Sequence, residues 1–483
     1  MSGLFSTKTP EACGVPSGAV IAMLDHLKRS EVNIHGLCLM RGDAIFAEGY
    51  WKPFHKKSLH RMYSITKSFV SVAIGLLQEE GRLTLDDPIC AHFPEKLSGP
   101  PHPFLAETTI RHMLCMTSPH WSTTYKISES NDWVRTFFEV EPTHRPGTAF
   151  SYDTSASLVL AALVEKLSGK ALLDYLREKV LDKLDFSQEA YILPDPAGIS
   201  HGGSGLVCTL EDIYTFAYVC MNNGRLGDSQ LLPETYLKEA TSKQIDTSFL
   251  APINEKQGYG YQFWRSRHGG FTLYGMGGQL AVCFPKQKLI FATMADTIPN
   301  PADMQTMYDA FWTHIFPFVE HSSGTCEPLP EEPALYAQLA ERLEELEITP
   351  GVRGSKTSPL EKAVQDKKYV LDENPMGLEY FILHFEDERF TLCYRNKSGE
   401  YQIPFSMNGQ ESFRVPGVVQ DCLSFAAWTS PHVLTLQVSL IGQDFATARA
   451  QLAFKENTVT VHMKRNAEGL LENYNGNATG QAE

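Results

Sequence analysis

The feature that most constrains this chain is the stretch MYSITKSFVSVAIGLLQEEG at residues 62–81, where a serine and a lysine precede a long apolar run. The run predicts a helix over 64–80 that ends at Gly81, since glycine adopts the left-handed backbone of a helix end at little cost. A helix that is apolar around most of its circumference has to be buried. The chain must therefore fold around a large core, and its 483 residues suffice for that core in a protein of more than one domain.

Ser64 and Lys67 stand three residues apart, and side chains at that spacing lie on one face of a helix. Lys67 can therefore reach the Ser64 hydroxyl, which becomes a strong nucleophile only when a base removes its proton. A lysine is such a base when burial, nearby positive charge or the positive end of a helix dipole lowers its pKa. The backbone N–H of Ser64 at the helix start can also donate to an oxyanion. The segment predicts a nucleophile, its base and half of an oxyanion hole, and the alternative is a solvated pair without chemistry.

Strand patterns at both ends of residues 1–320 enclose a helical middle. Strands are predicted within 34–50, around a turn at 41–43, and again at 259–266, 271–276 and 288–295. Helical periodicity predicts helices at 17–29, 108–115, 131–139, 155–168, 171–180, 210–223, 233–241 and around 302–317. Strands that are separated from helices along the chain favour an α+β fold, in which the terminal strands pair into one antiparallel sheet flanked by helices, with a helical subdomain beside it.

The pattern changes after residue 320. Residues 321–350 are predicted to form a linker rich in Pro, Gly, Ser and Glu, followed by a short amphipathic helix. In residues 351–483 apolar side chains recur at every second position, as in HVLTLQVSL at 432–440. We expect a smaller all-β C-terminal module there, with seven or eight strands arranged as a barrel or a sandwich.

The composition argues against several classes of function. A net charge of -15 disfavours binding to nucleic acid or to an anionic membrane, and no apolar run approaches the roughly 20 residues of a membrane span. The ten cysteines form no C-x-x-C pair, as is typical of free thiols in a reducing compartment. The first residues lack the basic and apolar regions of a signal peptide, so we expect a cytoplasmic protein. The sixteen histidines show no metal-ligand spacing, and neither a metal nor a cofactor is expected.

The segment HRMYSITKSFVSVAIGLLQEEGRLTLDDPI closely resembles the first motif of the serine β-lactamase and penicillin-binding-protein superfamily, and looks most like its class C β-lactamase, DD-peptidase and esterase branch. Further resembling segments follow in the family's order: TTIRHMLCMTSPH, RPGTAFSYDTSASLVLAALVEKLSGKALLDYL, GGSGLVCTLEDIYTFAYVCMNNGRL and YGMGGQLAVCFPKQKLIFATMAD. The likeness covers about residues 10–315 and implies a β-lactamase/transpeptidase-like hydrolase domain over 1–320. The β module lies outside it.

Tyr152-Asp153-Thr154 takes the place of the family's second motif, Tyr-x-Asn. The resemblance makes Tyr152 the group that shares protons with Ser64 and Lys67. Physically, a neighbouring ammonium favours the phenolate, which can act as a base and then protonate the leaving group. The resemblance also implies a substrate-binding position for Thr154, which lacks the amide that usually orients the substrate there.

Met276-Gly277-Gly278 is aligned with the third motif, which is normally Lys-Thr-Gly or His-x-Gly. Gly277 and Gly278 would let a substrate approach the backbone, and the next residue, Gln279, would supply the second oxyanion N–H. Met276 carries no charge, whereas the family's cation at this position commonly receives the carboxylate of a β-lactam or of a D-Ala-D-Ala terminus. The neighbouring His268-Gly269-Gly270 could be offered as the missing motif and fits better as a hairpin turn.

The leading hypothesis is a serine hydrolase that forms an acyl-enzyme on Ser64 and cleaves a small-molecule ester or amide. A second hypothesis, in the same fold, is a β-lactamase or a DD-peptidase that acts on peptidoglycan stems. A third is a non-catalytic binding protein, which the presence of Ser64, Lys67 and Tyr152 disfavours. The acyl group, the leaving group, the oligomeric state and the role of the β module, as a lid, a dimerising element or a partner-binding element, stay open.

Overall fold

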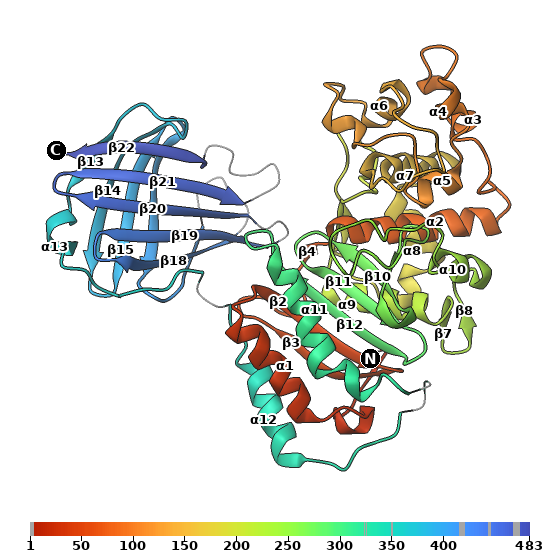
Figure 1. Cartoon of the computed structure of the whole chain (residues 1–483), viewed down its shortest axis with the longest axis horizontal. Coiled ribbons are helices and arrows are strands. Elements are labelled where there is room, and N and C mark those ends of the chain that lie inside the picture. The colour runs from red at the N-terminus through yellow and green to blue at the C-terminus, as the bar shows by residue number, and fades with distance from the viewer. Residues whose placement is uncertain are drawn as a thin grey trace. The chain divides into compact units, whose positions relative to one another are not determined.

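The computed structural model describes residues 4–322, 324, 326–348, 351–414, 421–442, 446–466 and 474–483 (Figure 1). The chain divides into two compact units. The first comprises Met1–Thr297 with Ala302–Glu347, and the second comprises Ile298–Pro301 with Ile348–Glu483. Each unit has a hydrophobic core of its own. None of the helices in these described ranges is both long and apolar enough to cross a membrane.

A seven-stranded sheet forms the centre of the first unit. Its strands are β1 (Ser6–Thr7), β2 (Ile34–Arg41), β3 (Ala44–Tyr50), β9 (Trp264–Arg265), β10 (Phe271–Gly275), β11 (Gln279–Phe284) and β12 (Leu289–Ala295). They are ordered β1-β3-β2-β12-β11-β10-β9, and all neighbours are antiparallel except β1 and β3. Strand β2 pairs with β12, so that Leu39 lies opposite Phe291. This confirms the predicted α+β fold, in which early and late strands share one antiparallel sheet.

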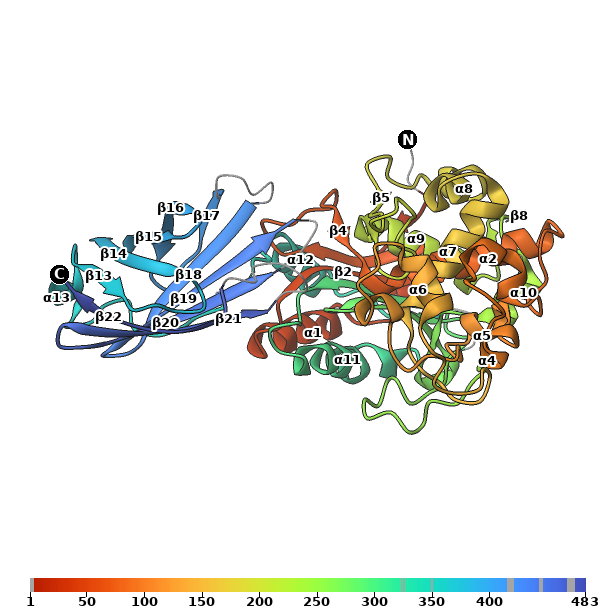
Figure 2. The ribbon, with the colours of Figure 1, turned by 90° about the horizontal axis from the view of Figure 1, so that it is seen from above.

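Helices cover both faces of this sheet, which is why β2, β11 and β12 are buried along their whole length. The covering helices are α1 (Ser17–Arg29), α9 (Leu210–Met221), α11 (Ala302–His314) and α12 (Pro333–Glu344). Helix α9 packs on β2, β11 and β12, and α1 contacts both α11 and α12. In Figure 2, α1 and α11 lie side by side below the sheet. Helix α12 is the short amphipathic helix predicted within 321–350; it packs on β3, where Leu343 and the following Leu346 lie against Gly49.

The helical part of the first unit is centred on α2 (Thr66–Glu79), which follows the single turn η2 (Tyr63–Ile65) and packs on α7 (Thr154–Ser168) (Figure 1). The remaining elements of this unit are η1 (Glu11–Cys13), β4 (His60–Arg61), α3 (Ile89–His92), η3 (Pro94–Lys96), α4 (Pro103–Ala106), α5 (Ile110–Leu114), η4 (Thr124–Lys126), α6 (Trp133–Glu139), α8 (Leu172–Lys179), η5 (Leu181–Leu184), β5 (Tyr191–Ile192), β6 (Leu206–Cys208), β7 (Arg225–Leu226), β8 (Ser229–Gln230), α10 (Glu234–Ala240), η6 (Arg267–Gly269) and η7 (Phe316–Phe318). The predicted burial of the 64–80 helix is confirmed, since residues 66–77 are all buried.

Two strand predictions differ from the structure. The predicted strand over 259–266 is mostly loop, and only its end forms β9. Positive φ angles of 106° at Gly258 and 62° at Gln262 interrupt the extended backbone there. Strand β11 was not among the predicted strands, because all its residues are buried and no alternation marks it.

The close packing of α2 at Gly75 leads to an expectation for stability. A Cβ added at Gly75 of α2 would lie 2.5 Å from the ring of Tyr236 in α10. Since Tyr236 is buried and its hydroxyl hydrogen-bonds Ser71 at 2.9 Å, the ring has little room to move. We expect Gly75→Ala to lower the free energy of unfolding by about 1–3 kcal/mol, as measured by urea denaturation. The control Gly99→Ala places its methyl in open space and should change this free energy by less than about 0.5 kcal/mol; equal effects would contradict the packing argument.

The second unit contains a ten-stranded antiparallel sheet and the short helix α13 (Glu361–Val364) (Figure 1). The strands are β13 (Lys368–Leu371), β14 (Leu378–Glu386), β15 (Arg389–Asn396), β16 (Gly399–Ser406), β17 (Glu411–Arg414), β18 (Asp421–Ser430), β19 (Val433–Ile441), β20 (Thr447–Lys455), β21 (Thr458–Asn466) and β22 (Gly476–Ala482). The edge strand β16 packs against β17 and β18 at the other edge, and Met407 bridges to Ala426. The sheet is thus nearly closed into a barrel, with more strands than the predicted seven or eight.

Candidate active site

Ser64 and Lys67 are brought together at the junction of η2 and α2, as their spacing predicts. Lys67 Nζ lies 2.9 Å from Ser64 Oγ and donates to the carbonyl oxygen of Gly203 at 2.6 Å. Lys67 is only 1% exposed, although lysine is rarely buried, and Ser64 stays partly exposed. The arrangement holds a buried amine directly against a reachable hydroxyl.

Tyr63, the residue before Ser64, has a left-handed backbone with a φ of 47°. For a bulky residue this conformation is strained, and such strain persists only where the surroundings hold it in place. The Tyr63 carbonyl accepts a 2.6 Å hydrogen bond from Thr66 Oγ1, and the Arg61 guanidinium lies 4.7 Å from the centre of its ring. The strained turn presents the Ser64 hydroxyl at the start of a buried helix.

The glycine-rich segment at 202–205 can approach Lys67 because the positions of Gly202 and Gly203 have no room for a side chain. A Cβ at Gly202 would lie 2.4 Å from the Ala161 side chain, and one at Gly203 would lie 2.2 Å from Thr154 Cγ2. The segment is therefore wedged against α7, close enough for the Gly203 carbonyl to accept the Lys67 hydrogen bond. Its hydrogen bond with Lys67 makes this segment part of the site.

Tyr152 joins the same cluster from the loop before α7. Its ring centre lies 4.8 Å from Lys67 Nζ, and the ring stacks on Trp264 at 5.7 Å. Burial raises the pKa of Tyr152 above its ordinary value, whereas a hydrogen bond with Ser64 lowers it and the charge of Glu255 raises it further. Tyr152 is therefore a neutral phenol at rest, placed to exchange a proton with Ser64.

Asp153 and Thr154 have structural contacts at the start of α7. The fully buried Asp153 carboxylate caps the helix and accepts from Ser155 N at 2.8 Å, from Ser155 Oγ and from Ser118 Oγ at 3.0 Å. The Thr154 methyl lies against the Gly203 position, and the Thr154 N–H donates to Thr123 Oγ1 at 3.3 Å. A substrate contact by Thr154 stays a prediction.

The buried carboxyl of Asp153 gives an expected pH dependence. Burial raises its pKa to about 6, above the roughly 3.9 of an unfolded chain. Between about pH 4 and 6 the folded protein therefore holds more protons than the unfolded one, and stability from this group falls as pH rises, by up to about 3 kcal/mol. Asp153→Asn should remove this pH dependence. The free energy of unfolding of the wild type minus that of the variant, measured by urea denaturation, should therefore decline from pH 4 to pH 6. The exposed Asp174→Asn serves as control, and a difference that does not vary with pH would contradict the assignment.

The predicted third motif, Met276-Gly277-Gly278, directly follows the last residue of β10. Gly275, the last residue of β10, lies against the Met62 carbonyl, and a Cβ there would approach that oxygen to 2.3 Å. The end of β10 thus meets the segment that carries Ser64, and the next backbone N–H is that of Met276. The uncharged Met276 side chain is 37% exposed.

The residues after Met276 shape the hairpin. Gly277 and Gly278 have φ angles of 79° and 91°, and Gly278 faces Ala295 at the end of β12. The Gln279 side chain is fully buried and donates to the carbonyl oxygens of Met276 at 3.1 Å and Ala295 at 2.7 Å. Gln279 therefore anchors the turn between β10 and β11.

Two groups near the site were missed at the level of sequence. Burial, together with the positive charges of Lys67 and Arg61, lowers the pKa of His201 to about 3, so this histidine adds no charge beside Lys67. Glu255, whose pKa is raised by burial, accepts from Tyr274 Oη at 2.9 Å and acts on Tyr152 electrostatically. The glycines that follow His201 could have indicated that this histidine lies near the site. Glu255 lies in an irregular loop whose sequence contains no motif.

Comparisons with known proteins agree with this geometry. The family model described as Beta-lactamase matches residues 29–310. A 6-aminohexanoate-dimer hydrolase of Paenarthrobacter ureafaciens is 22% identical over 334 residues, and the match covers 61% of this chain and 82% of that protein. Penicillin-binding protein 4* of Bacillus subtilis is 26% identical over 141 residues, covering 27% of this chain and 30% of that protein.

A solved structure from Bacillus anthracis, assigned provisionally as a 6-aminohexanoate-dimer hydrolase, has a similar fold. The TM-score is 0.52 at 20% sequence identity, and the match covers 64% of this chain and 83% of that one. At this identity the likeness concerns the fold alone.

Proposed function

Because this chain belongs to the β-lactamase family, we propose that it is a serine hydrolase that forms an acyl-enzyme on Ser64 and cleaves a small ester or amide. The observation that carries the proposal is the placement of the buried Lys67 amine 2.9 Å from the Ser64 hydroxyl, with Tyr152 against both. A lysine amine is costly to bury, and general-base catalysis gives this one a role.

In the first step Ser64 Oγ attacks the substrate carbonyl carbon and its proton passes to Lys67 Nζ, which must be uncharged at that moment. The carbonyl oxygen becomes an oxyanion. Tyr152 then protonates the leaving alcohol or amine and regains a proton from the Lys67 ammonium. A water molecule attacks the ester on Ser64, its proton follows the reverse path, and the acid is released with Ser64 restored.

The oxyanion would be held by two backbone donors, the N–H groups of Ser64 and Met276. Ser64 N lies at the open start of the helical segment, and Met276 N follows Gly275, which contacts the Met62 carbonyl. This assigns the second donor to Met276 in place of Gln279. In this assignment, Gly277 and Gly278 contribute by allowing the tight turn between β10 and β11.

The charges around the site support an uncharged acyl substrate. Met276 offers no cation for a substrate carboxylate, and the Glu255 carboxylate influences Tyr152 from nearby. A β-lactam or a D-Ala-D-Ala terminus would bring an anion into these surroundings. The relative from Paenarthrobacter ureafaciens is named for hydrolysis of a 6-aminohexanoate dimer, and a small substrate of that kind is consistent with the proposal.

A substrate panel tests this assignment. We expect p-nitrophenyl butyrate to be hydrolysed through an acyl-enzyme that intact-protein mass spectrometry detects after an acid quench. Nitrocefin should show a kcat/KM at least about tenfold lower, because a hydrogen-bonded cation for its carboxylate is missing. A faster reaction with nitrocefin would favour the β-lactamase or DD-peptidase alternative. If neither substrate were hydrolysed and no adduct formed with either, the proposal would be wrong and a binding role would be favoured.

A further inference from the structure

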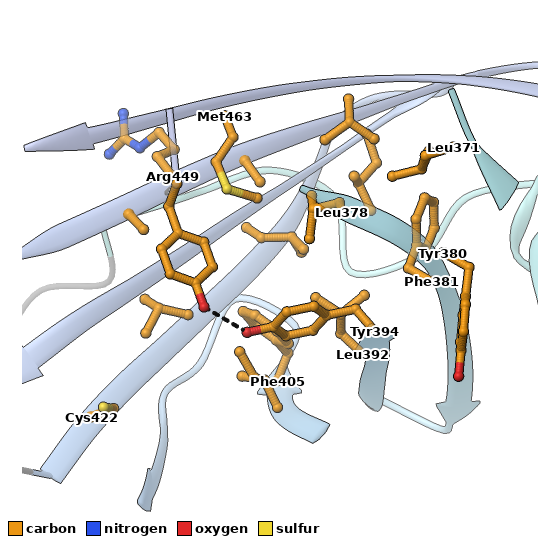
Figure 3. A pocket seen from close by; sticks show the side chains of 18 of the residues that line it. Leu371, Leu378, Tyr380, Phe381, Leu392, Tyr394, Phe405, Cys422, Arg449 and Met463 are labelled. Carbon is orange, nitrogen blue, oxygen red and sulfur yellow. Dashed lines mark hydrogen bonds between the residues drawn. The ribbon is translucent and has the colours of Figure 1, made fainter. Parts of the chain in front are cut away.

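The barrel of the second unit contains a partly open cavity of about 140 Å³ (Figure 3). Side chains alternate between the inside and the outside of a barrel, and the inward positions of nearly all its strands contribute to this wall. The wall is almost wholly apolar, with Leu378, Phe381, Leu392, Phe405, Leu436 and Ala450 among its members. An apolar cavity of roughly 150 Å³ stays dry and can take up benzene, so this space suits an apolar guest better than water.

A pair of tyrosine hydroxyls interrupts this apolar wall. The hydroxyls of Tyr394 and Tyr474 lie 3.0 Å apart, drawn as the dashed line in Figure 3. Burial raises the pKa of Tyr394, which keeps its hydroxyl neutral. Two hydroxyls that share one hydrogen bond leave one O–H hydrogen and several lone pairs for a third group. The cavity therefore offers one neutral hydrogen-bonding point.

The charged group at the wall faces away from the interior. Arg449 lines the cavity with part of its chain, but its guanidinium donates to Gln437 Oε1 and to the Gly351 carbonyl, each at 2.7 Å. Arg449 is exposed, whereas its neighbour Ala450 is buried, as strand alternation requires. Among the described residues that line the cavity, Arg449 is the only charged one and its guanidinium faces outward, so an ionised guest would lose its hydration without gaining a counter-charge from them.

We propose that the C-terminal barrel binds a small neutral molecule, about the size of one aromatic ring or a six-carbon chain, whose single oxygen hydrogen-bonds the Tyr394–Tyr474 pair. The size follows from the cavity volume, and the neutrality follows from the apolar wall. The oxygen completes the hydrogen bonding of the tyrosine pair. This site is independent of the proposed hydrolase chemistry at Ser64.

Isothermal titration calorimetry of the full chain with toluene and benzyl alcohol tests the site, since the two probes differ by one hydroxyl. We expect saturable one-site binding of both. Ala450→Phe, which places a ring in the cavity from β20, should abolish both signals. Ala453 lies on the same strand but is not part of the cavity wall, so Ala453→Phe should leave both dissociation constants within about twofold of wild type. The double variant Tyr394→Phe/Tyr474→Phe should raise the constant for benzyl alcohol by about 3- to 10-fold and leave that for toluene unchanged.

The double variant keeps every carbon of the wall, so it remains informative if Ala450→Phe fails to fold by circular dichroism. Absence of saturable binding of both probes to the wild type would overturn the proposal, as would wild-type binding by folded Ala450→Phe. If the double variant changed the dissociation constants for toluene and benzyl alcohol equally, the proposed role of the tyrosine pair would be wrong. Hydrolysis of p-nitrophenyl butyrate should be the same in all variants.

Discussion

Ser64→Ala should lower the kcat of ester hydrolysis at least about a thousandfold, because no other hydroxyl takes the place of a removed nucleophile. Ser64 Oγ is the atom that Lys67 Nζ contacts at 2.9 Å, and Ser64 is partly exposed. The same substitution should abolish labelling by a fluorophosphonate probe, read as the mass shift of the intact protein. Two independent readouts, the rate and the adduct, then report on one atom.

The matched control for this variant is Ser68→Ala, one turn further along α2. The Ser68 hydroxyl is buried and donates to the Gln262 carbonyl at 2.9 Å, so its loss affects packing without touching the proposed nucleophile. Ser68→Ala should keep its labelling and most of its hydrolytic rate, at some cost in melting temperature. Equal rates and labelling of Ser64→Ala and wild type would remove Ser64 from the mechanism.

Lys67→Met should lower kcat by about a hundred- to ten-thousandfold, the range expected for loss of a positioned general base. Methionine fills a similar volume in this buried position, so the change mainly removes the amine that contacts Ser64 Oγ and the Gly203 carbonyl. Rates of p-nitrophenyl butyrate hydrolysis across pH, together with the melting temperature, separate lost chemistry from lost stability.

Lys67→Arg distinguishes a base from a fixed positive charge, because a guanidinium stays protonated throughout the accessible pH range. We expect Lys67→Arg to be as slow as Lys67→Met. The exposed Lys238→Met, which breaks only a surface pair with Glu234, should be as active as wild type. If Lys67→Arg retained most of the activity, the lysine would act through its charge and the proton would have to go elsewhere.

The parts of the site that the sequence predicts are those fixed by local geometry. Ser64 and Lys67 meet because three residues separate them on one helical segment, and the apolar run beyond them predicts the burial of α2. The resemblance brought in Tyr152 from a distant segment, and the structure places it beside both. Helix periodicity also predicted the bounds of α1 and α7 to within a residue.

The features that the sequence did not reveal depend on register and on tertiary packing. The contact between Gly275 and the Met62 carbonyl follows from where β10 ends, which the sequence around it does not show. The short amphipathic helix predicted within 321–350 is present as α12, but only its contact with β3 shows what its leucines cover. The steric need for Gly202 and Gly203 likewise arises from α7, which lies about forty residues earlier in the sequence.

The pairing of β2 with β12 also bears on how the chain is made. Met40 lies opposite Ile290, so 250 residues must be translated between two strands that share hydrogen bonds. At about 5–20 residues per second, a ribosome needs roughly 12–50 seconds for that interval. Meanwhile β2 and β3 can form a hairpin, but the edge of β2 that later receives β12 has no partner strand. We expect the nascent chain to be most prone to aggregation, and most dependent on chaperones, during this interval.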